Sequence, residues 1–174
     1  MKRRYSTFPA AIILLCALFR ADAGQRNWHV VSLGVRQHQD HEVITDYPFD
    51  DNDLSYGIAW EYHEPSAYWQ IAADYCPDPT GTNTLEYVFT PQINLITKDQ
   101  WWRGGLGVMW PYVNDSVEGT DWLDTYWQFI LGLQLAATRV DLDVMTYYVF
   151  ESWGDLSDFE FSDLEYGVRL GFEF

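Results

Sequence analysis

Arginines and carboxylates at regularly alternating positions are the first residues in this 174-residue chain whose types and spacing suggest chemistry. Buried together, such groups could relay protons or line a narrow pore. They could equally form a structural network of ion pairs, because a carboxylate keeps its charge away from water only with a partner. We expect the structural role. The predicted interior network comprises Arg36, Glu61, Asp74, Glu86, Arg103, Arg139, Asp141, Asp143, Glu165 and Arg169.

Histidines offer the second candidate chemistry. His38 and His41 lie close to Thr45 and to several acidic residues, in a segment that has no strand pattern. This is the only stretch where a histidine, a carboxylate and a hydroxyl could assemble for nucleophilic catalysis. His63 is expected in a turn. We interpret the segment around His38 as an ordinary loop and predict that the protein is not an enzyme. A lipid-modifying enzyme is the least favoured alternative.

Acidic residues concentrated in the same segment suggest a third chemistry. Asp50, Asp51 and Asp53 follow each other closely, and hard cations such as calcium prefer oxygen ligands of this kind. The spacing matches no calcium-binding loop, so we expect a solvated acidic surface and no metal or cofactor. Divalent cations bound at the loops remain an alternative.

The element that must position these groups is clearest at the end of the chain. Over residues 163–174, every even position is apolar or aromatic and every odd position is charged or glycine. Side chains of a strand point alternately to opposite faces, so this segment has one apolar face and one polar face. Its length is close to the roughly 9–11 residues that a tilted strand needs to cross a bilayer.

Eight segments show the same alternation. Their apolar faces together hold 45 residues, none of which is Asp, Glu, Lys or Arg, although 21% of the chain is charged. The opposite faces carry the arginines and carboxylates, amides and several glycines. A lipid-facing exterior around a polar interior explains this distribution, whereas a soluble lipocalin-like barrel would need the reverse. The apolar faces run through 29–37, 54–62, 67–75, 85–95, 102–112, 125–135, 140–150 and 164–174.

Connections between these segments alternate between long and short. The long ones are 38–53, 76–84, 113–124 and 151–162, and the short ones are 63–66, 96–101 and 136–138. All long loops therefore lie at one end and all short turns at the other, as in outer-membrane barrels. The sequence predicts an all-β fold, an eight-stranded antiparallel up-and-down transmembrane β-barrel.

The first 23 residues are predicted to be a cleaved signal peptide. Lys2, Arg3 and Arg4 precede an apolar run, and Ala21-Asp22-Ala23 has the pattern of a cleavage site. The barrel domain then covers residues 24–174. Cys76 is its single cysteine, so no internal disulfide is expected, and the role of this thiol is unexplained.

The net charge excludes one class of partner and favours another. Residues 24–174 contain six basic residues against 25 acidic ones. Nucleic-acid binding requires a basic surface and is excluded. The four long loops hold 15 acidic residues and no Lys or Arg. This pattern argues against direct ionic contact with lipopolysaccharide phosphates and favours a cationic partner.

At the level of its class, the chain resembles the small eight-stranded bacterial outer-membrane β-barrels, such as the membrane domain of outer-membrane protein A and its single-domain relatives. The most specific element is the closing strand ending in the aromatic Phe174. The resemblance implies a location in the outer membrane, contact with its lipid, and recognition by the barrel-assembly machinery. The residues it implies for that recognition are Tyr166, Leu170, Phe172 and Phe174.

The function that we expect is a sealed polar core with a structural or surface-interaction role through acidic external loops. A narrow passive channel with porin-like activity is the alternative. No motif selects a subfamily, so no functional residue is transferred, and the ligand and the oligomeric state stay undetermined.

Overall fold

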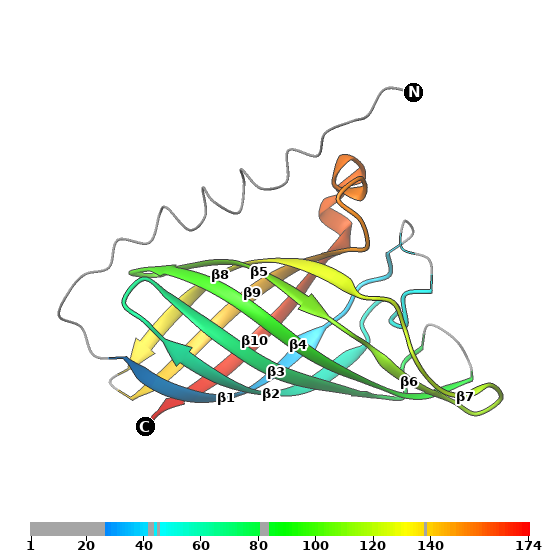
Figure 1. Ribbon diagram of the computed structural model, residues 1–174, viewed down its shortest axis with the longest axis horizontal. Coiled ribbons are helices and arrows are strands. Elements are labelled where there is room, and N and C mark those ends of the chain that lie inside the picture. Colours follow the sequence, from blue (N-terminus) through cyan, green and yellow to red (C-terminus); the bar gives the residue numbers. More distant parts are fainter. Residues whose placement is uncertain (1–26, 42–43, 45, 81–83, 138) are drawn as a thin grey trace, which may run out of the picture.

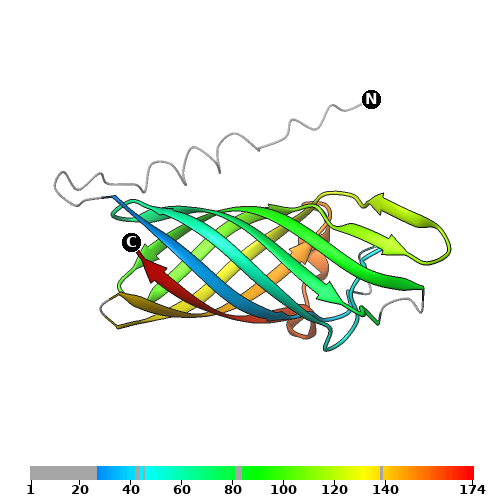
Figure 2. The same cartoon turned by 90° about the horizontal axis from the view of Figure 1, so that it is seen from below.

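A single closed antiparallel barrel accounts for nearly all of the described chain (Figures 1 and 2). The computed structural model describes residues 27–41, 44, 46–80, 84–137 and 139–174. The predicted signal peptide, residues 1–23, lies outside these ranges. Among the described residues, no helix is long and apolar enough to span a membrane.

Eight strands form the barrel, and each pairs with its neighbours in the chain. The first and last strands, β1 and β10, close the barrel with Val30 opposite Glu173 and Gln37 opposite Tyr166. This confirms the predicted fold class. The strands are β1 (Trp28–Gln37), β2 (Leu54–His63), β3 (Ala67–Pro77), β4 (Leu85–Asp99), β5 (Trp102–Met109), β8 (Tyr126–Ala137), β9 (Val140–Phe150) and β10 (Leu164–Glu173).

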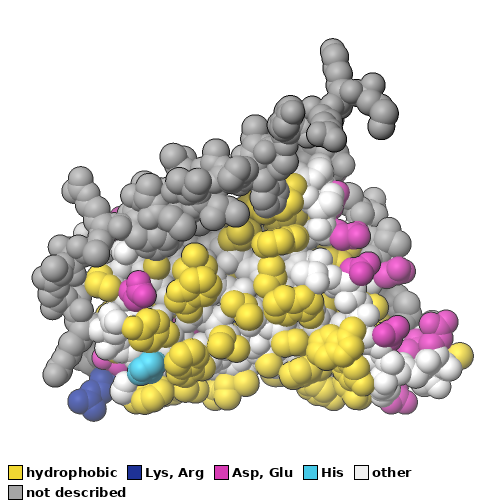
Figure 3. All heavy atoms as spheres, in the orientation of Figure 1, with side chains coloured by type: hydrophobic (Ala, Val, Ile, Leu, Met, Phe, Trp, Pro, Cys, Tyr) yellow, Lys and Arg dark blue, Asp and Glu magenta, His cyan; other side chains and the backbone are white. Residues whose placement is uncertain are grey.

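Apolar side chains cover the outside of the barrel and polar ones fill its inside. Leu33, Ile58 and Ile71 are each more than half exposed. On the opposite face of the same strands, Arg36, Glu61 and Gln70 are at most 3% exposed. Figure 3 shows the apolar surface over the middle of the barrel, with carboxylates gathered at one end. The barrel therefore has the inverse of a soluble protein's polarity, as the alternation predicted.

One predicted loop is instead a hairpin. Residues 113–124 were expected to be irregular, but β6 (Tyr112–Asp115) pairs with β4 and with β7 (Gly119–Trp122). The hairpin projects beyond the barrel at the end where the long loops lie, which we call the loop end (Figures 1 and 2). The apolar–polar alternation of these two strands is too short to be recognised from the sequence. They form because β6 pairs with the long strand β4, a tertiary contact that local propensity does not encode.

The connection between β9 and β10 is also ordered. It contains two short 3-10 helices, η1 (Asp155–Asp158) and η2 (Phe161–Asp163). Trp153 and Phe159 from this connection pack on Phe150 and Tyr148 of β9, with ring-centroid distances of 5.2 and 4.8 Å. The two β9 residues, expected to face lipid, are consequently buried. The closing strand is shorter than the twelve predicted residues, because Asp163 belongs to η2.

Candidate functional site

The Glu165 carboxylate is the centre of a buried cluster at the loop end of the barrel interior. Arg36 pairs with it at 2.5 Å, and the Tyr47 hydroxyl donates to its other oxygen at 2.5 Å. His38 and His41 approach the same carboxylate to 3.0 and 3.4 Å, although neither nitrogen is aligned for a hydrogen bond. Desolvation, together with the nearby carboxylate, raises the pKa of Tyr47 well above its ordinary value, so its phenol stays a donor.

This Glu165 cluster joins the first long loop to the barrel wall. Glu165 and Arg36 belong to β10 and β1, whereas the two histidines and the tyrosine come from residues 38–53. Arg36 also lies over the Tyr147 ring at 4.1 Å. Its charge thus meets a carboxylate and an aromatic ring, while its Nη2 makes no hydrogen bond among the described residues.

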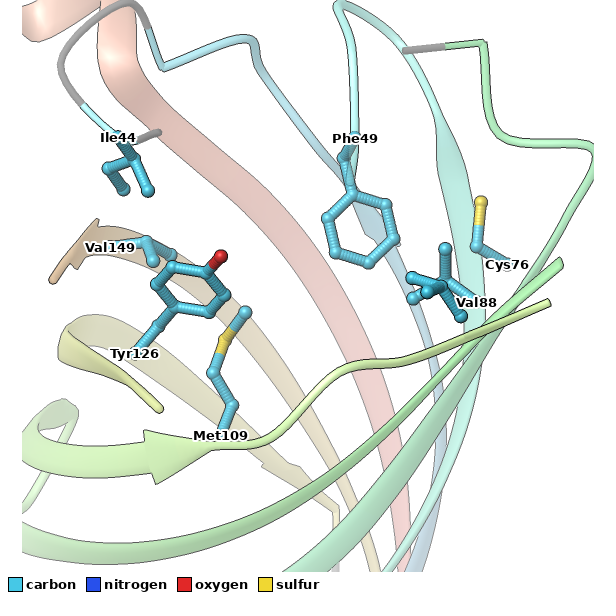
Figure 4. Packing of buried hydrophobic residues seen from close by; sticks show 8 residues of the cluster. Ile44, Phe49, Cys76, Val88, Met109, Tyr126 and Val149 are labelled. Carbon is cyan, nitrogen blue, oxygen red and sulfur yellow. The ribbon is translucent and has the colours of Figure 1, made fainter. Parts of the chain in front are cut away.

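Next to the Glu165 cluster, which it contacts through Phe49 and His38, a cluster of buried apolar side chains packs at the loop end of the barrel interior (Figure 4). Phe49 from the first loop is 1% exposed and stacks on the His38 ring at 3.7 Å. The side chains in Figure 4 come from several strands and point into the same interior space. The cluster contains Ile44, Phe49, Cys76, Val88, Met109, Val113, Tyr126 and Val149. Cys76 therefore packs as a small apolar residue, which explains a thiol that the sequence left without a role.

Amide side chains continue the polar network along the barrel. Arg36 donates to Gln128 at 2.8 Å, and Gln128 donates to Asn94 at 2.8 Å. Asn94 donates to Gln70 at 2.8 Å, and Gln70 donates to Glu61 at 2.9 Å. Strands far apart in the sequence are linked in this way. An eight-stranded barrel has an interior just wide enough for side chains to fill.

A second buried carboxylate, Glu61, lies at the opposite end of the barrel interior, where the short turns are, which we call the turn end. We call the residues around it the Glu61 cluster. Glu61 accepts hydrogen bonds from Ser32 at 3.0 Å and Gln70 at 2.9 Å, and its other oxygen lies 2.7 Å from His63. Lys98 lies 3.1 Å from the second nitrogen of His63 and 3.9 Å above the Trp28 ring. The expectation that His63 lies in a turn is wrong, because it ends β2 and is buried.

Asp74 and Arg169 form a third pair, in the middle of the network. The Arg169 guanidinium lies 3.2 Å from Asp74, which also accepts a hydrogen bond from Gln92 at 2.5 Å. Two interior glycines make room for side chains of the polar network. A Cβ at Gly57 would collide with the Asp74 carboxylate, and one at Gly107 would collide with the Asn94 amide.

Not all predicted network residues enter the interior. Glu86 and Arg139 are exposed; Glu86 accepts a hydrogen bond from Asn114 at the loop end. Both continue the alternation of their strands beyond the closed part of the barrel, where the inner face opens to solvent. Arg103 and Asp143 are buried and Asp141 is half-buried. Arg103 donates to the backbone oxygen of Trp102 at 2.9 Å.

A histidine, a carboxylate and a hydroxyl do assemble, but with partners other than those predicted. Nε2 of His38 lies 2.7 Å from the Ser55 hydroxyl, and its Nδ1 faces Glu165. Thr45 lies outside the described residues. Ser55 is 1% exposed, and Phe49 covers the imidazole. This arrangement holds the first loop in place and does not present a nucleophile at a surface.

Sequence reasoning missed the contribution of the first loop to the interior. A signal was present, because Tyr47, Pro48 and Phe49 form an apolar run within an otherwise acidic loop. For His63, the signal was its position two residues after Glu61, which places both side chains on the same face of β2.

The acidic loop residues are engaged in local hydrogen bonds. Asp53 accepts hydrogen bonds from the backbone nitrogen and hydroxyl of Thr80, and Asp51 accepts one from the backbone nitrogen of Asp40. Within the described ranges, no group of three or more His, Cys, Asp or Glu side chains could hold a metal ion. Asp53 thus connects the first two loops, whereas Asp51 orders the first loop internally.

The four residues implied in assembly lie on the outer face of β10 and after its end. Tyr166, Leu170, Phe172 and Phe174 are all exposed, Phe174 most strongly. The backbone nitrogen of Phe174 donates to His29 at 3.1 Å, and the His29 and Phe174 rings stack at 6.0 Å. The last residue is thereby fixed beside the first strand.

Comparison with known proteins relates the chain to solved structures only. No protein-family model and no curated protein matches it. Neisserial surface protein A superposes with a TM-score of 0.52 and 10% identity, over 86% of this chain and 100% of that chain. Ail, the attachment invasion locus protein of Yersinia pestis, covers 85% of this chain and 97% of its own, with 9% identity and a TM-score of 0.42. At such identity, the first likeness shows the fold alone: the chain is folded as a small eight-stranded β-barrel of the outer-membrane type.

Proposed function

We propose that this protein is exported through a signal peptide, spans the outer membrane as a sealed barrel, and presents acidic external loops to a cationic partner. The observation that supports a sealed core is that Phe49 and the Glu165 cluster pack together across the loop end of the barrel interior. Further support comes from the chain of hydrogen-bonded side chains that crosses the barrel interior from Arg36 to Glu61. A narrow passive channel is the second candidate, and it would need this packing to open.

The surface role is supported by the projecting hairpin. All four residues of β7 are exposed, and this strand lies at the end of the strand order, paired with β6. The carboxylate of Asp115 accepts hydrogen bonds from Thr84, Val117 and Glu118, which order the hairpin turn. These bonds, the one from Thr84 first, lower the pKa of Asp115. The hairpin thus offers fixed negative charge beside an exposed strand edge, which suits an extended basic peptide.

The hairpin role is tested by the binding of a lysine-rich extended peptide to the folded protein. Replacing Glu118, Asp121 and Asp124 by their amides is expected to weaken binding about tenfold, since exposed charges each contribute about 0.2–1 kcal/mol. The matched control neutralises three carboxylates of the β9–β10 connection, Glu151, Asp158 and Glu160. Equal losses in both variants would contradict a hairpin site and leave only general attraction between opposite charges.

We also propose that Tyr166, Leu170, Phe172 and Phe174 are read by the barrel-assembly machinery. The support is the exposure of these side chains on the closing strand. Deleting Phe174 is expected to lower the amount of protein in the outer membrane while folding in detergent is preserved. Normal outer-membrane levels of the shortened chain would contradict this role.

A further inference from the structure

Four aromatic side chains form a continuous row across the outer surface at the loop end. Phe89 of β4 pairs with Tyr75 of β3 on one side and with Tyr112 of β6 on the other. Tyr112 in turn pairs with Trp122 of β7, and their ring centroids lie 5.0 Å apart. Directly paired residues have their side chains on the same face of a sheet. With about 4.8 Å between neighbouring strands, this aromatic row is roughly 14 Å long.

The aromatic row extends beyond the part of the barrel that would contact lipid. Tyr75 and Phe89 stand on barrel strands at the border of the apolar belt, where outer-membrane barrels carry aromatic girdles. Tyr112 and Trp122 belong to the hairpin, whose strands lie outside the closed barrel and project from its loop end (Figures 1 and 2). Trp122 is nevertheless 55% exposed. A girdle therefore explains the first two rings and leaves the two hairpin rings without a role.

Polar side chains lie beside the hairpin half of the aromatic row. Asn114 pairs with Thr120, and both lie two residues from the ring-bearing pair, on the same face of the hairpin. The Asn114 amide donates a hydrogen bond to Glu86 at 2.6 Å, which fixes its orientation. Positions two residues apart on a strand are separated by about 7 Å, a distance that one six-membered sugar ring can bridge. Flat rings beside an oriented amide and a hydroxyl suit a ligand with an apolar face and a polar edge.

A pyranose sugar has this combination. Its C–H bonds form an apolar face that can stack on an aromatic ring, and its hydroxyls can exchange hydrogen bonds with amide, hydroxyl and carboxylate groups. An anionic sugar is disfavoured, because the four long loops hold many carboxylates and no Lys or Arg. Stacking needs no basic residue and so agrees with loops that lack one.

The start of the aromatic row on the barrel wall identifies where the sugar comes from. Because Tyr75 and Phe89 continue the lipid-facing surface, a lipid standing beside β3 and β4 would bring its headgroup to the height of the row. We propose that the aromatic row binds the uncharged sugar headgroup of a glycolipid in the outer leaflet. The sugar stacks on Tyr112 and Trp122, with its hydroxyls toward Asn114 and Thr120.

This inference rests on the proposed membrane location but is independent of a basic peptide. The experiment is native mass spectrometry of the folded protein, titrated with digalactosyldiacylglycerol or with phosphatidylcholine of identical acyl chains. We expect the glycolipid to bind about tenfold more tightly, since only its headgroup can stack. Insertion into liposomes and heat-modifiable mobility are measured on the same sample. Failure of insertion would overturn the membrane location and this site with it, whereas equal affinity for both lipids in an inserting barrel would overturn the site alone.

The decisive pair of variants changes the shape of one side chain. Trp122→Leu keeps an apolar residue but removes the flat ring, and it is expected to weaken glycolipid binding about tenfold. Trp122→Tyr keeps a ring and is expected to stay within about threefold of the unmodified protein. Phe161→Ala removes an exposed ring of another connection and is expected to have no effect. Equal glycolipid affinity of Trp122→Leu and the unmodified protein would overturn the aromatic row as the binding site.

Two further arms test the source and the charge of the ligand. Soluble galactobiose, the free headgroup, is expected not to displace the glycolipid at tenfold molar excess, because the lipid anchor confines the sugar to the barrel surface. Displacement would overturn the membrane source. The combined variant Glu118→Gln, Asp121→Asn and Asp124→Asn is expected to retain glycolipid binding. A loss as large as that of Trp122→Leu would overturn an uncharged ligand.

Discussion

The two ends of the barrel interior each bury a carboxylate but neutralise it differently. At the loop end, Glu165 is paired with Arg36, a permanent cation, and with three side chains of a folded loop. At the turn end, Glu61 is held by Ser32, Gln70 and His63, all of which reach it from strands. Strands alone therefore complete the turn-end cluster, whereas the loop-end cluster requires the loop.

This difference indicates where the barrel is most vulnerable. Glu61 has no arginine or lysine among its direct partners, so loss of its charge leaves no permanent cation without a partner. A carboxylate bound to a buried arginine does not tolerate such a loss, because either group alone keeps an uncompensated charge. The loop-end cluster is thus expected to contribute more to stability and to respond to changes in the first loop.

The largest effect is expected for Arg36→Ala. The substitution leaves the fully buried Glu165 without its cation, which costs about 3–5 kcal/mol of folding free energy. Urea-induced unfolding of the barrel in liposomes, followed by tryptophan fluorescence, measures the change. An unfolding midpoint equal to that of the unmodified protein would show that the histidines and Tyr47 alone can hold the charge.

A somewhat smaller effect is expected for Phe49→Ala, which tests the loop contribution. Removing this ring opens a cavity in the apolar cluster and uncovers His38, at a cost of about 3 kcal/mol. The same unfolding assay gives the free energy, and protease cleavage within residues 38–53 should become faster. Phe161→Ala is the control, since that exposed ring lies in another loop. Cleavage that is unchanged would contradict a packed first loop.

The smallest effect of the three is expected for Glu61→Gln. The amide oxygen still accepts from Ser32 or Gln70, and no arginine is left without a carboxylate, so the loss is about 1 kcal/mol. The matched variant Glu165→Gln strands Arg36 and should lose about 3 kcal/mol or more. Equal losses for the two variants would remove the distinction between the two ends.

The sequence predicted the strands and their faces well, because alternation is a local property with a period of two residues. The alternation alone identified Arg36, Asp74, Glu165 and Arg169 as residues of the barrel interior. It did not predict which carboxylate meets which donor. Which groups meet depends on the register between strands. Whether a residue is enclosed depends also on where the closed part of the barrel ends, and for this reason the prediction that Glu86 and Arg139 lie in the interior is wrong.

The loops were the least predictable part. Tyr47 and Phe49 enter the barrel, and Phe159 lies against Tyr148, through contacts that no periodic pattern encodes. The β6–β7 hairpin likewise forms because β4 extends beyond the barrel and offers it an edge. In each case a tertiary contact determines the local structure, and local propensity contributes little.

Ion conductance across a planar bilayer tests the sealed core most directly. The folded protein is inserted, and insertion is verified by heat-modifiable mobility of the reconstituted sample. Because Phe49, the Glu165 cluster and the amide network lie buried in the interior, no steady current above that of the protein-free bilayer is expected. Discrete, long-lived openings of the unmodified protein would contradict the sealed core and favour the narrow channel.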